Sequence, residues 1–505
     1  MALRVTNMMS QNTLLNNINT INYSLMETQQ QLASGKRVNK PSDNPVNARS
    51  IIEIQSTISR DTQYLRNIDY SRRWLEQSET ALSQASNLIS RAKEITVQMS
   101  NSVAYDTQNM INVATEVKQM ISETISLGNT TVGSRYLFGG TNVGQPPVAS
   151  GGIFFGNSKV MTTRMDEFTT FDITTSASKM FVSDFNPIVS ANTTIASLNK
   201  GAGATLGAIS ITNRAGTTAN VNLAGLTTVG QVITAINASG LGITAAINAT
   251  NDGISLTDAN ASPVSNLIVA NADTTNTASA LKILGNRSAS SISGGDIDPA
   301  ATASTLISEL NGGAGLTLGD INIANGAASG VVTLTAAATL NDVLTTINAS
   351  AMNVTATINA TGTGINVTSN VATTIAVVNE VGNGKSAANL GIQGGNNMLK
   401  TLELLDQALV AGDANAVRNL MGNMNTITDN ISQVRADIGG RVNRLDSKMN
   451  VLEDTNLGNE VNLTYMRDTD MTQAAMQFSL LQTNQNAALS TASKILNTSL
   501  VDFLR

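Results

Sequence analysis

The sequence predicts a multi-domain α and α+β protein, in which a long antiparallel helical bundle from both termini carries a β-rich insert of two duplicated small α+β modules. Three observations lead to this fold class. Apolar residues recur at intervals of three and four near both ends, which is the period of a helix. The middle of the chain is instead rich in Ala, Thr, Asn, Gly, Ile and Val, with few charges, which suits short strands and turns. This middle region also repeats itself at a spacing of about 111 residues.

The composition excludes several classes of function. There is no Cys and no His among 505 residues, which removes disulfides, most zinc sites and the usual general base. We find no catalytic constellation of Asp, Glu, Lys or Ser, so we expect no enzyme, no cofactor and no metal site. The net charge of -6, with both signs mixed along the helices, disfavours a nucleic-acid partner. We also expect no membrane span and no cleaved signal peptide, because no stretch of 18 apolar residues exists and the first 30 residues mix Asn, Thr and Gln.

A narrow apolar stripe, which we call a seam, runs along each predicted terminal helix. The N-terminal seam is interrupted only by Thr28, and it consists of Leu14, Ile18, Ile21, Leu25 and Leu32. The C-terminal seam is interrupted by Gln485, and it consists of Ala474, Phe478, Leu481, Ala488, Ala492 and Ile495. Such a stripe fits one neighbouring helix and is too thin to build a globular core alone. We therefore expect an assembly interface in which the seams pair with each other or with neighbouring copies; an ordinary core face at each end is the alternative.

Between the seams and the insert, the sequence predicts a break and then long helices. Gly35 can adopt the left-handed conformation that ends a helix, and Pro41 and Pro45 forbid its continuation. Ser42 or Asp43 can then cap a second helix. Heptad spacing from residue 51 to residue 89 predicts a helix about 75 Å long. A third helix over 106–127 would fold back along it, and a matching apolar row over 420–452 predicts the returning rod.

Aromatic residues mark the internal boundaries. Phe and Tyr cluster from Tyr136 to Phe185, and none of Phe, Tyr or Trp follows until Tyr465. We expect seven segments: an N-terminal assembly helix (1–40), an N-terminal helical rod (41–135), a β-rich connector (136–190), a first module (191–285), a second module (286–395), a C-terminal helical rod (396–465) and a C-terminal assembly helix (466–505).

The duplicated modules share short motifs. The tetrapeptide INAS at 236–239 recurs at 347–350, and INAT at 247–250 recurs at 358–361. Each copy is expected to contain two strands, a helix (228–238 or 340–349) and two more strands, with the one helix packed on an antiparallel sheet. Because the copies lack aromatic platforms and charge clusters, we expect a surface spacer; a ligand-binding module is the alternative.

Four motifs lie in the predicted helical parts of the chain and beside them. They are MALRVTNMM at 1–9, LASGKRVNKPSDNP at 32–45, GSRYLFGGT at 133–141 and the closing stretch 487–504, which ends in SLVDFL. Together these motifs resemble the flagellin superfamily, and within it the family of flagellar hook-associated protein 3, the hook-filament junction protein. The duplicated module resembles the hook IN motif of the same superfamily. The resemblance adds Leu500 and Phe503, in the closing helix, to the expected assembly interface.

The resemblance implies a structural subunit that joins the hook to the flagellin filament of the bacterial flagellum. It implies a secreted protein that leaves the cell through the flagellar type III apparatus without a cleaved signal peptide. The implied partners are further copies in a ring, hook-associated protein 1 on the hook side, flagellin on the filament side and an export chaperone. A filament flagellin is the alternative, although PSDNP at 41–45 and the Met8-Met9 pair favour the junction protein. A secreted adhesin or enzyme carried by the insert is the third possibility.

Overall fold

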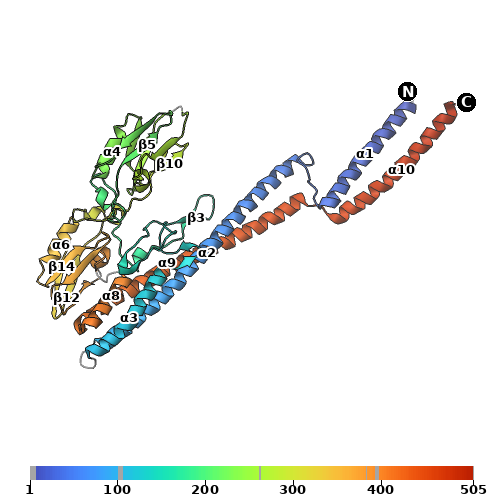
Figure 1. Ribbon diagram of the computed structural model, residues 1–505. Helices are drawn as coiled ribbons and strands as arrows, with labels where there is room; N and C mark the ends of the chain where they lie inside the picture. Colours follow the sequence, from blue (N-terminus) through green and yellow to red (C-terminus); the bar gives the residue numbers. More distant parts are fainter. Residues whose placement is uncertain (1–6, 101–105, 261–262, 383, 393–396, 504–505) are drawn as a thin grey trace. The chain divides into compact units, whose positions relative to one another are not determined.

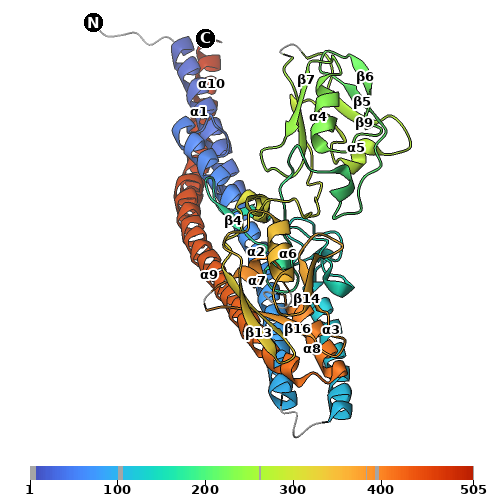
Figure 2. The ribbon, with the colours of Figure 1, turned by 90° about the vertical axis from the view of Figure 1, so that its left-hand side faces the viewer.

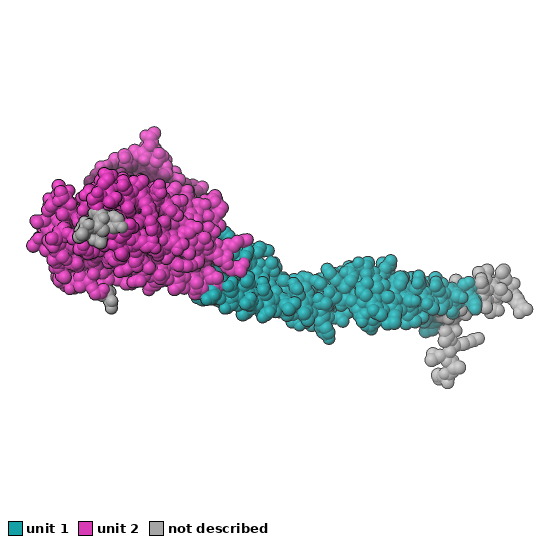
Figure 3. Space-filling view, turned by 90° about the horizontal axis from the view of Figure 1, so that it is seen from below, with its two compact units in different colours: residues 1–70, 163–171, 443–505 teal, residues 71–162, 172–442 magenta. Residues whose placement is uncertain are grey.

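The computed structural model describes residues 7–100, 106–260, 263–382, 384–392 and 397–503 (Figure 1). The chain divides into two compact units, coloured separately in Figure 3. Unit 1 comprises residues 1–70, 163–171 and 443–505, and unit 2 comprises residues 71–162 and 172–442. Two long helices, α2 (Pro45–Met99) and α9 (Ala414–Arg467), contribute to both units. The predicted fold class is confirmed, because helices occupy both ends of the chain and small antiparallel sheets occupy its middle.

In unit 1 the two terminal helices lie side by side and run antiparallel. Helix α1 spans Asn7–Ser34 and helix α10 spans Met471–Phe503 (Figure 1). Gly35 ends α1 with a φ of 69°, as the sequence predicts, and its N–H donates to the carbonyl of Gln31. Asp470 begins α10, because its carboxylate accepts hydrogen bonds from the backbone N–H groups of Thr472 and Gln473.

The start of α2 differs from the prediction in its capping residue. Asn44, and neither Ser42 nor Asp43, caps the helix: its side-chain oxygen accepts a hydrogen bond of 3.0 Å from the N–H of Asn47. Pro45 then occupies the first helical position, where its fixed φ is suited and its missing N–H costs nothing. Asp43 instead closes the preceding turn, because its carboxylate accepts hydrogen bonds from the N–H groups of Asn39 and Lys40.

The remainder of unit 1 is a two-helix arm with a hairpin against it. The beginning of α2 and the end of α9 share a small core that contains Ile51 and Leu463. The hairpin of β3 (Thr162–Arg164) and β4 (Thr170–Asp172) is held to both helices. Asn67 of α2 donates to the carbonyl of Arg164 at 3.0 Å, and Lys448 of α9 forms a 2.8 Å ion pair with Asp166.

Unit 2 contains a helical bundle. Its helices are the rest of α2 and α9, together with α3 (Thr107–Gly128) and α8 (Met398–Ala411). Helix α3 begins where predicted, because Asp106 caps it. The returning rod is two helices, since Gly412 adopts a φ of 70° and ends α8 before α9 starts. The bundle core is formed by side chains at the predicted heptad positions, including Leu75, Leu82, Ile89, Leu420, Ile427, Ile431 and Ile438.

A charged residue that interrupts the apolar row of α2 finds a partner on α9. Glu79 forms an ion pair with Arg435, with 2.7 Å between the closest oxygen and nitrogen atoms. Both side chains are about one third exposed. Glu79 interrupts the heptad pattern of α2, and its carboxylate is paired where the two helices meet. An unpaired charge at this position would destabilise the bundle.

The connector carries the aromatic cluster that the sequence places before the insert. It includes the strand pair β1 (Thr131–Val132) and β2 (Arg135–Tyr136) and three-residue 3-10 helices at Ser150–Gly152 and Ala177–Lys179. The rings of Phe138 and Phe181 meet edge to face with centroids 5.4 Å apart. Phe154 is also fully buried. Phe138 and Phe181 are fully buried as well.

The first module forms two small sheets around one core (Figure 2). One sheet has the order β10-β9-β5-β6 and the other β11-β8-β7. The strands are β5 (Ala208–Thr212), β6 (Thr218–Asn222), β7 (Ile243–Ile247), β8 (Ile254–Asp258), β9 (Leu267–Asn271), β10 (Gly285–Arg287) and β11 (Ser291–Ser293). Helix α4 (Val229–Asn237) is accompanied by a short helix, α5 (Thr277–Ala280). The prediction of one sheet and one helix is therefore wrong in detail, because the module has two sheets and a second, short helix.

The second module repeats this plan with fewer strands. Its sheets have the orders β13-β12-β16 and β14-β15. The elements are β12 (Asp320–Asn325), β13 (Ala328–Thr333), α6 (Leu340–Asn348), β14 (Val354–Ile358), β15 (Ile365–Ser369), β16 (Ala376–Glu380) and α7 (Ser386–Asn389). Thr228 and Thr339 begin α4 and α6 with the same capping box, which confirms the duplication at the level of single residues.

The first module is inserted into the second. Phe185, which precedes the first module in sequence, belongs to the core of the second, whereas Ile297 completes the core of the first. The backbone pairing is equivalent in both: Asn311 N–H donates to Phe185 O at 2.8 Å, and Asn199 N–H donates to Ile297 O at 2.9 Å. The boundary expected between residues 285 and 286 falls inside β10, so the structure moves the end of the first module to about Asp298.

Candidate assembly surface

Nine of the ten seam residues with described side chains lie at intermediate exposure. They are Leu14, Ile18, Ile21, Leu25 and Leu32 on α1 and Phe478, Leu481, Ala488 and Ala492 on α10. The structure brings the two seams together along the antiparallel pair within one chain. Half-burial is what a two-helix pair provides, because each seam side chain has a partner on one side only. Ala474, at the start of α10, is buried.

The remaining three predicted interface residues lie at the end of α10. Ile495, Leu500 and Phe503 are within the helix, but their side chains lie outside the described residues. The motif at residues 1–9 likewise lies largely before the first described residue, Asn7.

The polar interruptions of the two seams satisfy their hydrogen-bonding groups. The amide of Gln485 donates to the side-chain oxygen of Asn22 across the pair, at 2.6 Å. Thr28 is buried, and its hydroxyl donates to the carbonyl of Ser24 at 2.8 Å. A half-buried polar pair at one position favours a single register of two helices, because any shift leaves both groups without their partner. The Asn22–Gln485 bond therefore fixes how α1 and α10 align.

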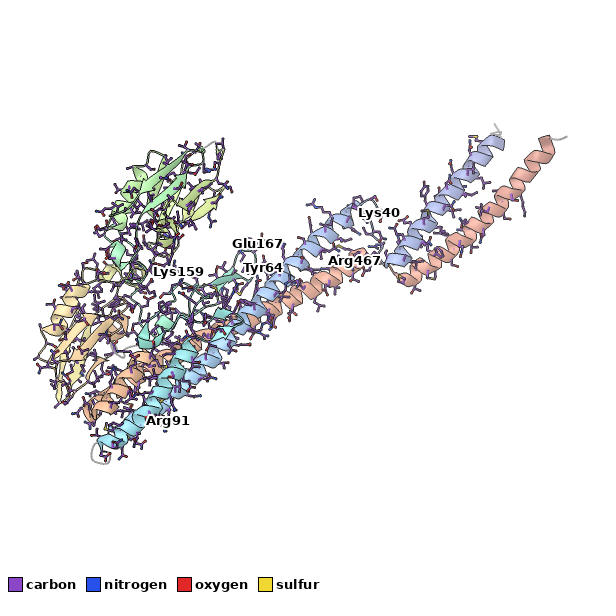
Figure 4. The ribbon with its side chains drawn as sticks, in the orientation of Figure 1. Lys40, Tyr64, Arg91, Lys159, Glu167 and Arg467 are labelled. Atoms are coloured by element: carbon purple, nitrogen blue, oxygen red, sulfur yellow. The ribbon has the colours of Figure 1, made fainter. Side chains whose placement is uncertain are left out.

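The base of the pair is a short backbone junction where α1 meets α2 and α9 meets α10, near the labelled residues Lys40 and Arg467 (Figure 4). The N–H of Arg37 donates to the carbonyl of Arg467 at 2.6 Å, and the N–H of Thr469 donates to that of Gly35 at 3.0 Å. Hydrogen bonds from the backbone N–H groups of Lys40 and Asn39 lower the pKa of the Asp43 carboxyl. These hydrogen bonds hold the turn after α1 in one conformation and join it to the segment between α9 and α10.

A second apolar row, which we call the outer row, lies away from the seams and remains exposed. On α1 it comprises Leu15, Tyr23 and Met26, which are 58%, 75% and 65% exposed. On α10 it comprises Met476 and Leu480, which are 64% and 61% exposed. In a helix with 3.6 residues per turn, Tyr23 and Met476 project from the side opposite the seam of the same helix, and Leu15, Met26 and Leu480 lie about 100–120° around the helix from it. Seam pairing therefore covers one face of each helix and leaves a second apolar face uncovered.

The terminal helices also carry almost no charge. Glu27 is the one charged residue in the sequence of α1, and Lys494 and Asp502 are the only ones in that of α10. A helix that faces water on its outer side usually carries charged residues there. The sequence reasoning identified the seams and missed the outer row, although the low charge and the spacing of Leu15, Tyr23 and Met26 are visible in the sequence.

Two structural findings bear on other classes of site. Within the part of the chain that the structure describes, no group of three or more Asp or Glu side chains is arranged to hold a metal ion. No helix among the described residues is long and apolar enough to cross a membrane.

Comparison with known families supports the reading of the two ends. The family model of the bacterial flagellin N-terminal helical region matches residues 5–143, and that of the bacterial flagellin C-terminal helical region matches residues 421–504. The matched regions contain both terminal helices, the junction and much of the bundle, and they leave the two modules outside.

Individual relatives give the same picture. Flagellar hook-associated protein 3 of Salmonella typhimurium is 28% identical over 159 residues, which is 31% of this chain and 50% of that protein. The Escherichia coli protein of the same name is 27% identical over 158 residues, with the same two coverages. The chain thus aligns with about half the length of each relative.

Solved structures of similar proteins cover more of the chain at lower identity. The crystal structure of Xanthomonas campestris FlgL is 14% identical and covers 81% of this chain and 99% of its own, with a TM-score of 0.36. That of flagellar hook associated protein-3 from Legionella pneumophila is 13% identical and covers 82% and 98%, with a TM-score of 0.37. The two ends of this chain are therefore similar to the N- and C-terminal helical regions of bacterial flagellin, and about a third of the chain is similar to half of flagellar hook-associated protein 3.

Proposed function

We propose that this protein is a structural subunit of the bacterial flagellum that joins the hook to the flagellin filament and assembles through its paired terminal helices. The observation that carries the proposal is the outer row. Leu15, Tyr23 and Met26 on α1 and Met476 and Leu480 on α10 stay exposed after the seams have paired. Several exposed apolar side chains on helices that carry almost no charge are typical of a surface that another protein covers.

The proposed occupant of the outer row is the terminal helix pair of a neighbouring subunit. A neighbour with the same low-charge surface can cover this row without leaving an unpaired charge behind. The seams then hold one subunit together, and the outer rows hold subunits to each other. The half-buried Asn22–Gln485 bond supports a fixed register for each pair, which a regular assembly needs.

The proposed partners follow from the hook-associated protein 3 relatives. They are further copies of this chain in a ring, hook-associated protein 1 on the hook side and flagellin on the filament side. We also propose that an export chaperone covers the terminal helices before assembly and that the chain is exported without a cleaved signal peptide. The resulting location is the extracellular flagellum.

A filament flagellin is the second candidate, because both family models that match the chain describe bacterial flagellin regions. The two candidates predict different positions in the cell. A junction protein forms a single short zone between hook and filament, whereas a filament subunit is distributed along the whole filament.

A deletion strain combined with antibody labelling tests the proposal. Loss of a junction protein should leave hooks in place, abolish filaments and release flagellin monomers into the medium. Labelled antibody on complemented cells should bind at one point at the base of each filament. Continuous labelling along the filament would favour the flagellin candidate, and normal filaments in the deletion strain would contradict the junction role.

A further inference from the structure

The chain crosses between the two modules at two equivalent, strained points, which we call the crossings. They are Asn186–Pro187, where the chain enters the first module, and Asp298–Pro299, where it leaves. Asn186 and Asp298 have φ values of 41° and 44°. A residue other than glycine rarely adopts a positive φ, and a following proline restricts it further. Each crossing is therefore held in this conformation by its surroundings.

Two lysines of the first module also adopt conformations that favour glycine. Lys200 and Lys282 have φ values of 57° and 53°. The equivalent positions of the second module are Gly312 and Gly391, with φ values of 65° and 56°. A left-handed conformation costs a side chain about 1 kcal/mol or more relative to glycine. The first module thus carries a lysine at two places where the same backbone would be relaxed with glycine.

The side chains of these lysines make contacts that offset the strain. Lys200 Nζ donates to the carbonyls of Phe154 and Gly156 in the connector and lies 4.7 Å from the centroid of the Phe154 ring. Lys282 Nζ lies 2.9 Å from the carboxylate of Asp298 at the second crossing. A glycine could make neither contact.

The connector contributes a lysine in return. Lys159, labelled in Figure 4, forms ion pairs with Asp252 and Asp296 of the first module, the second at 3.4 Å. Asp252 is held in place by hydrogen bonds from the Asn248 amide and the Thr250 hydroxyl, at 2.6 and 2.8 Å. Thr363 stands at the corresponding place in the second module, so that module lacks this acceptor. Lys200 of the first module thus contacts the connector, and Lys159 of the connector contacts the first module. The second module has neither a lysine at the position that corresponds to Lys200 nor an aspartate at the one that corresponds to Asp252.

We propose that Lys159 and Lys200 form a charge latch between the connector and the first module, and that opening the latch lets this module turn about the two crossings. The module is covalently joined to the rest of the chain by two single strands of backbone, at Asn186–Pro187 and Asp298–Pro299. Beside these crossings, Ile188 N–H donates to Glu309 O at 2.9 Å and Ala300 N–H donates to Ser197 O at 2.7 Å, so the module turns about a short hinge at each point. With the latch closed, the module keeps one orientation. With the latch open, the strained crossings relax and the orientation becomes variable.

The latch is sensitive to ionic strength because it is partly exposed. The side chain of Lys159 is 40% exposed, and those of Asp252 and Asp296 are 13% and 15% exposed. Salt shortens the range of charge interactions from about 10 Å at 0.1 M to about 3 Å at 1 M. High salt therefore weakens the latch through the exposed part of Lys159, while leaving the apolar cores of both modules intact.

Pulsed electron paramagnetic resonance on the full chain tests the latch. The sequence contains no Cys, so Val264→Cys in the first module and Val331→Cys in the second place two spin labels at exposed sites only. We expect a narrow distance distribution at about 0.05 M salt and a broad one at about 1 M. The double variant Lys159→Gln, Lys200→Gly should be broad at both salt concentrations.

Two further variants separate latch opening from unfolding. Lys200→Gly relieves backbone strain, so the thermal stability of the first module should be unchanged or higher while the distance distribution broadens. Lys385→Gln removes an exposed lysine of the second module and should behave as the parent. A narrow distribution in the double variant at low salt, or a parent distribution that salt leaves narrow, would overturn the proposal.

Discussion

At the scale of single residues, the fold depends on side chains that serve segments far away in sequence. Phe185 is 2% exposed and completes the core of the second module, although more than 100 residues of the first module separate it from that core. It occupies the position that Ile297 holds in the first module. The Phe185 side chain therefore packs the segment that precedes the first module into the core of the second module.

Replacing Phe185 with Ala should destabilise the second module by about 3–5 kcal/mol, because a buried ring is lost and a cavity remains. The first module should keep its stability, since Phe185 is outside its core. Chemical denaturation followed by hydrogen exchange in each module measures both effects. Phe168→Ala, at a ring that is 91% exposed, is the matched control and should change neither. Equal destabilisation of both modules would contradict the insertion.

Asp166 links the β3–β4 hairpin to α9, and this link depends on pH. A hydrogen bond from Lys448, with those from the N–H groups of Phe168 and Thr169, holds the pKa of Asp166 well below its usual range. A lowered folded-state pKa stabilises the fold above the unfolded-state pKa of about 3.9, and this contribution is lost as pH falls through the folded-state pKa. Acidification should therefore weaken this contact.

The comparison of wild type with Asp166→Asn reveals this contribution. The variant should be less stable at pH 7, and the difference should narrow as the pH falls below about 4 towards the lowered folded-state pKa, because the Asp166 carboxyl of the unfolded chain is protonated first. Chemical denaturation of the two proteins across this range measures the gap. A gap that stays constant with pH would show that the Asp166 carboxylate contributes no charge interaction.

At the scale of elements, the insertion of one module into the other predicts which piece can be removed. Deleting residues 187–298 and joining Asn186 to Pro299 retains Phe185, so the second module should still unfold cooperatively. Deleting residues 183–298 removes the same module together with Phe185, and the second module should then lose most of its stability. Circular dichroism during thermal unfolding distinguishes the two. Similar unfolding of both deletion variants would contradict the role of the Ser183–Asn186 segment.

The sequence predicted those elements whose signals are local. Asp106 begins α3, and most members of the apolar rows of α2 and α9 are buried as their spacing indicates. The cap of α2 was assigned to Ser42 or Asp43 instead of Asn44, because three adjacent residues can all cap and only the turn geometry selects one. The role of Phe185 could not be predicted from the sequence. Periodicity relates residues that are close in sequence, whereas the residues that Phe185 packs against follow the whole first module. The seams were predictable from spacing, but that Gln485 pairs with Asn22 required the register.

At the scale of the whole molecule, segments of the chain differ widely in how completely they bury their apolar side chains. The modules and the bundle bury complete cores. The terminal helices share only a half-buried seam, and ordering about 30 residues of each costs about 1–2 kcal/mol per residue of backbone entropy. The helix pair should therefore open easily in a free subunit and close permanently when neighbours cover the outer row.

Limited proteolysis of the isolated monomer measures this difference. Protease should remove roughly the first 40 and the last 35 residues while leaving the bundle and both modules intact, because cleavage follows local opening. Termini that resist protease in a verified monomer would show that the seams alone stabilise the pair, and that assembly is not needed to order it.

The proposed assembly depends on the outer row, and one substitution there tests it most directly. Leu480→Asp changes a side chain that is 61% exposed in the subunit, so the monomer should be exported and should keep its helix content. In the assembly it would bury an unpaired charge, at a cost of about 3–5 kcal/mol per subunit. We expect the variant to fail to restore filaments in a deletion strain, with the protein found in the medium. Val331→Asp, at a similarly exposed site on the second module, should restore them. Normal filaments with Leu480→Asp incorporated would contradict assembly through the terminal helices.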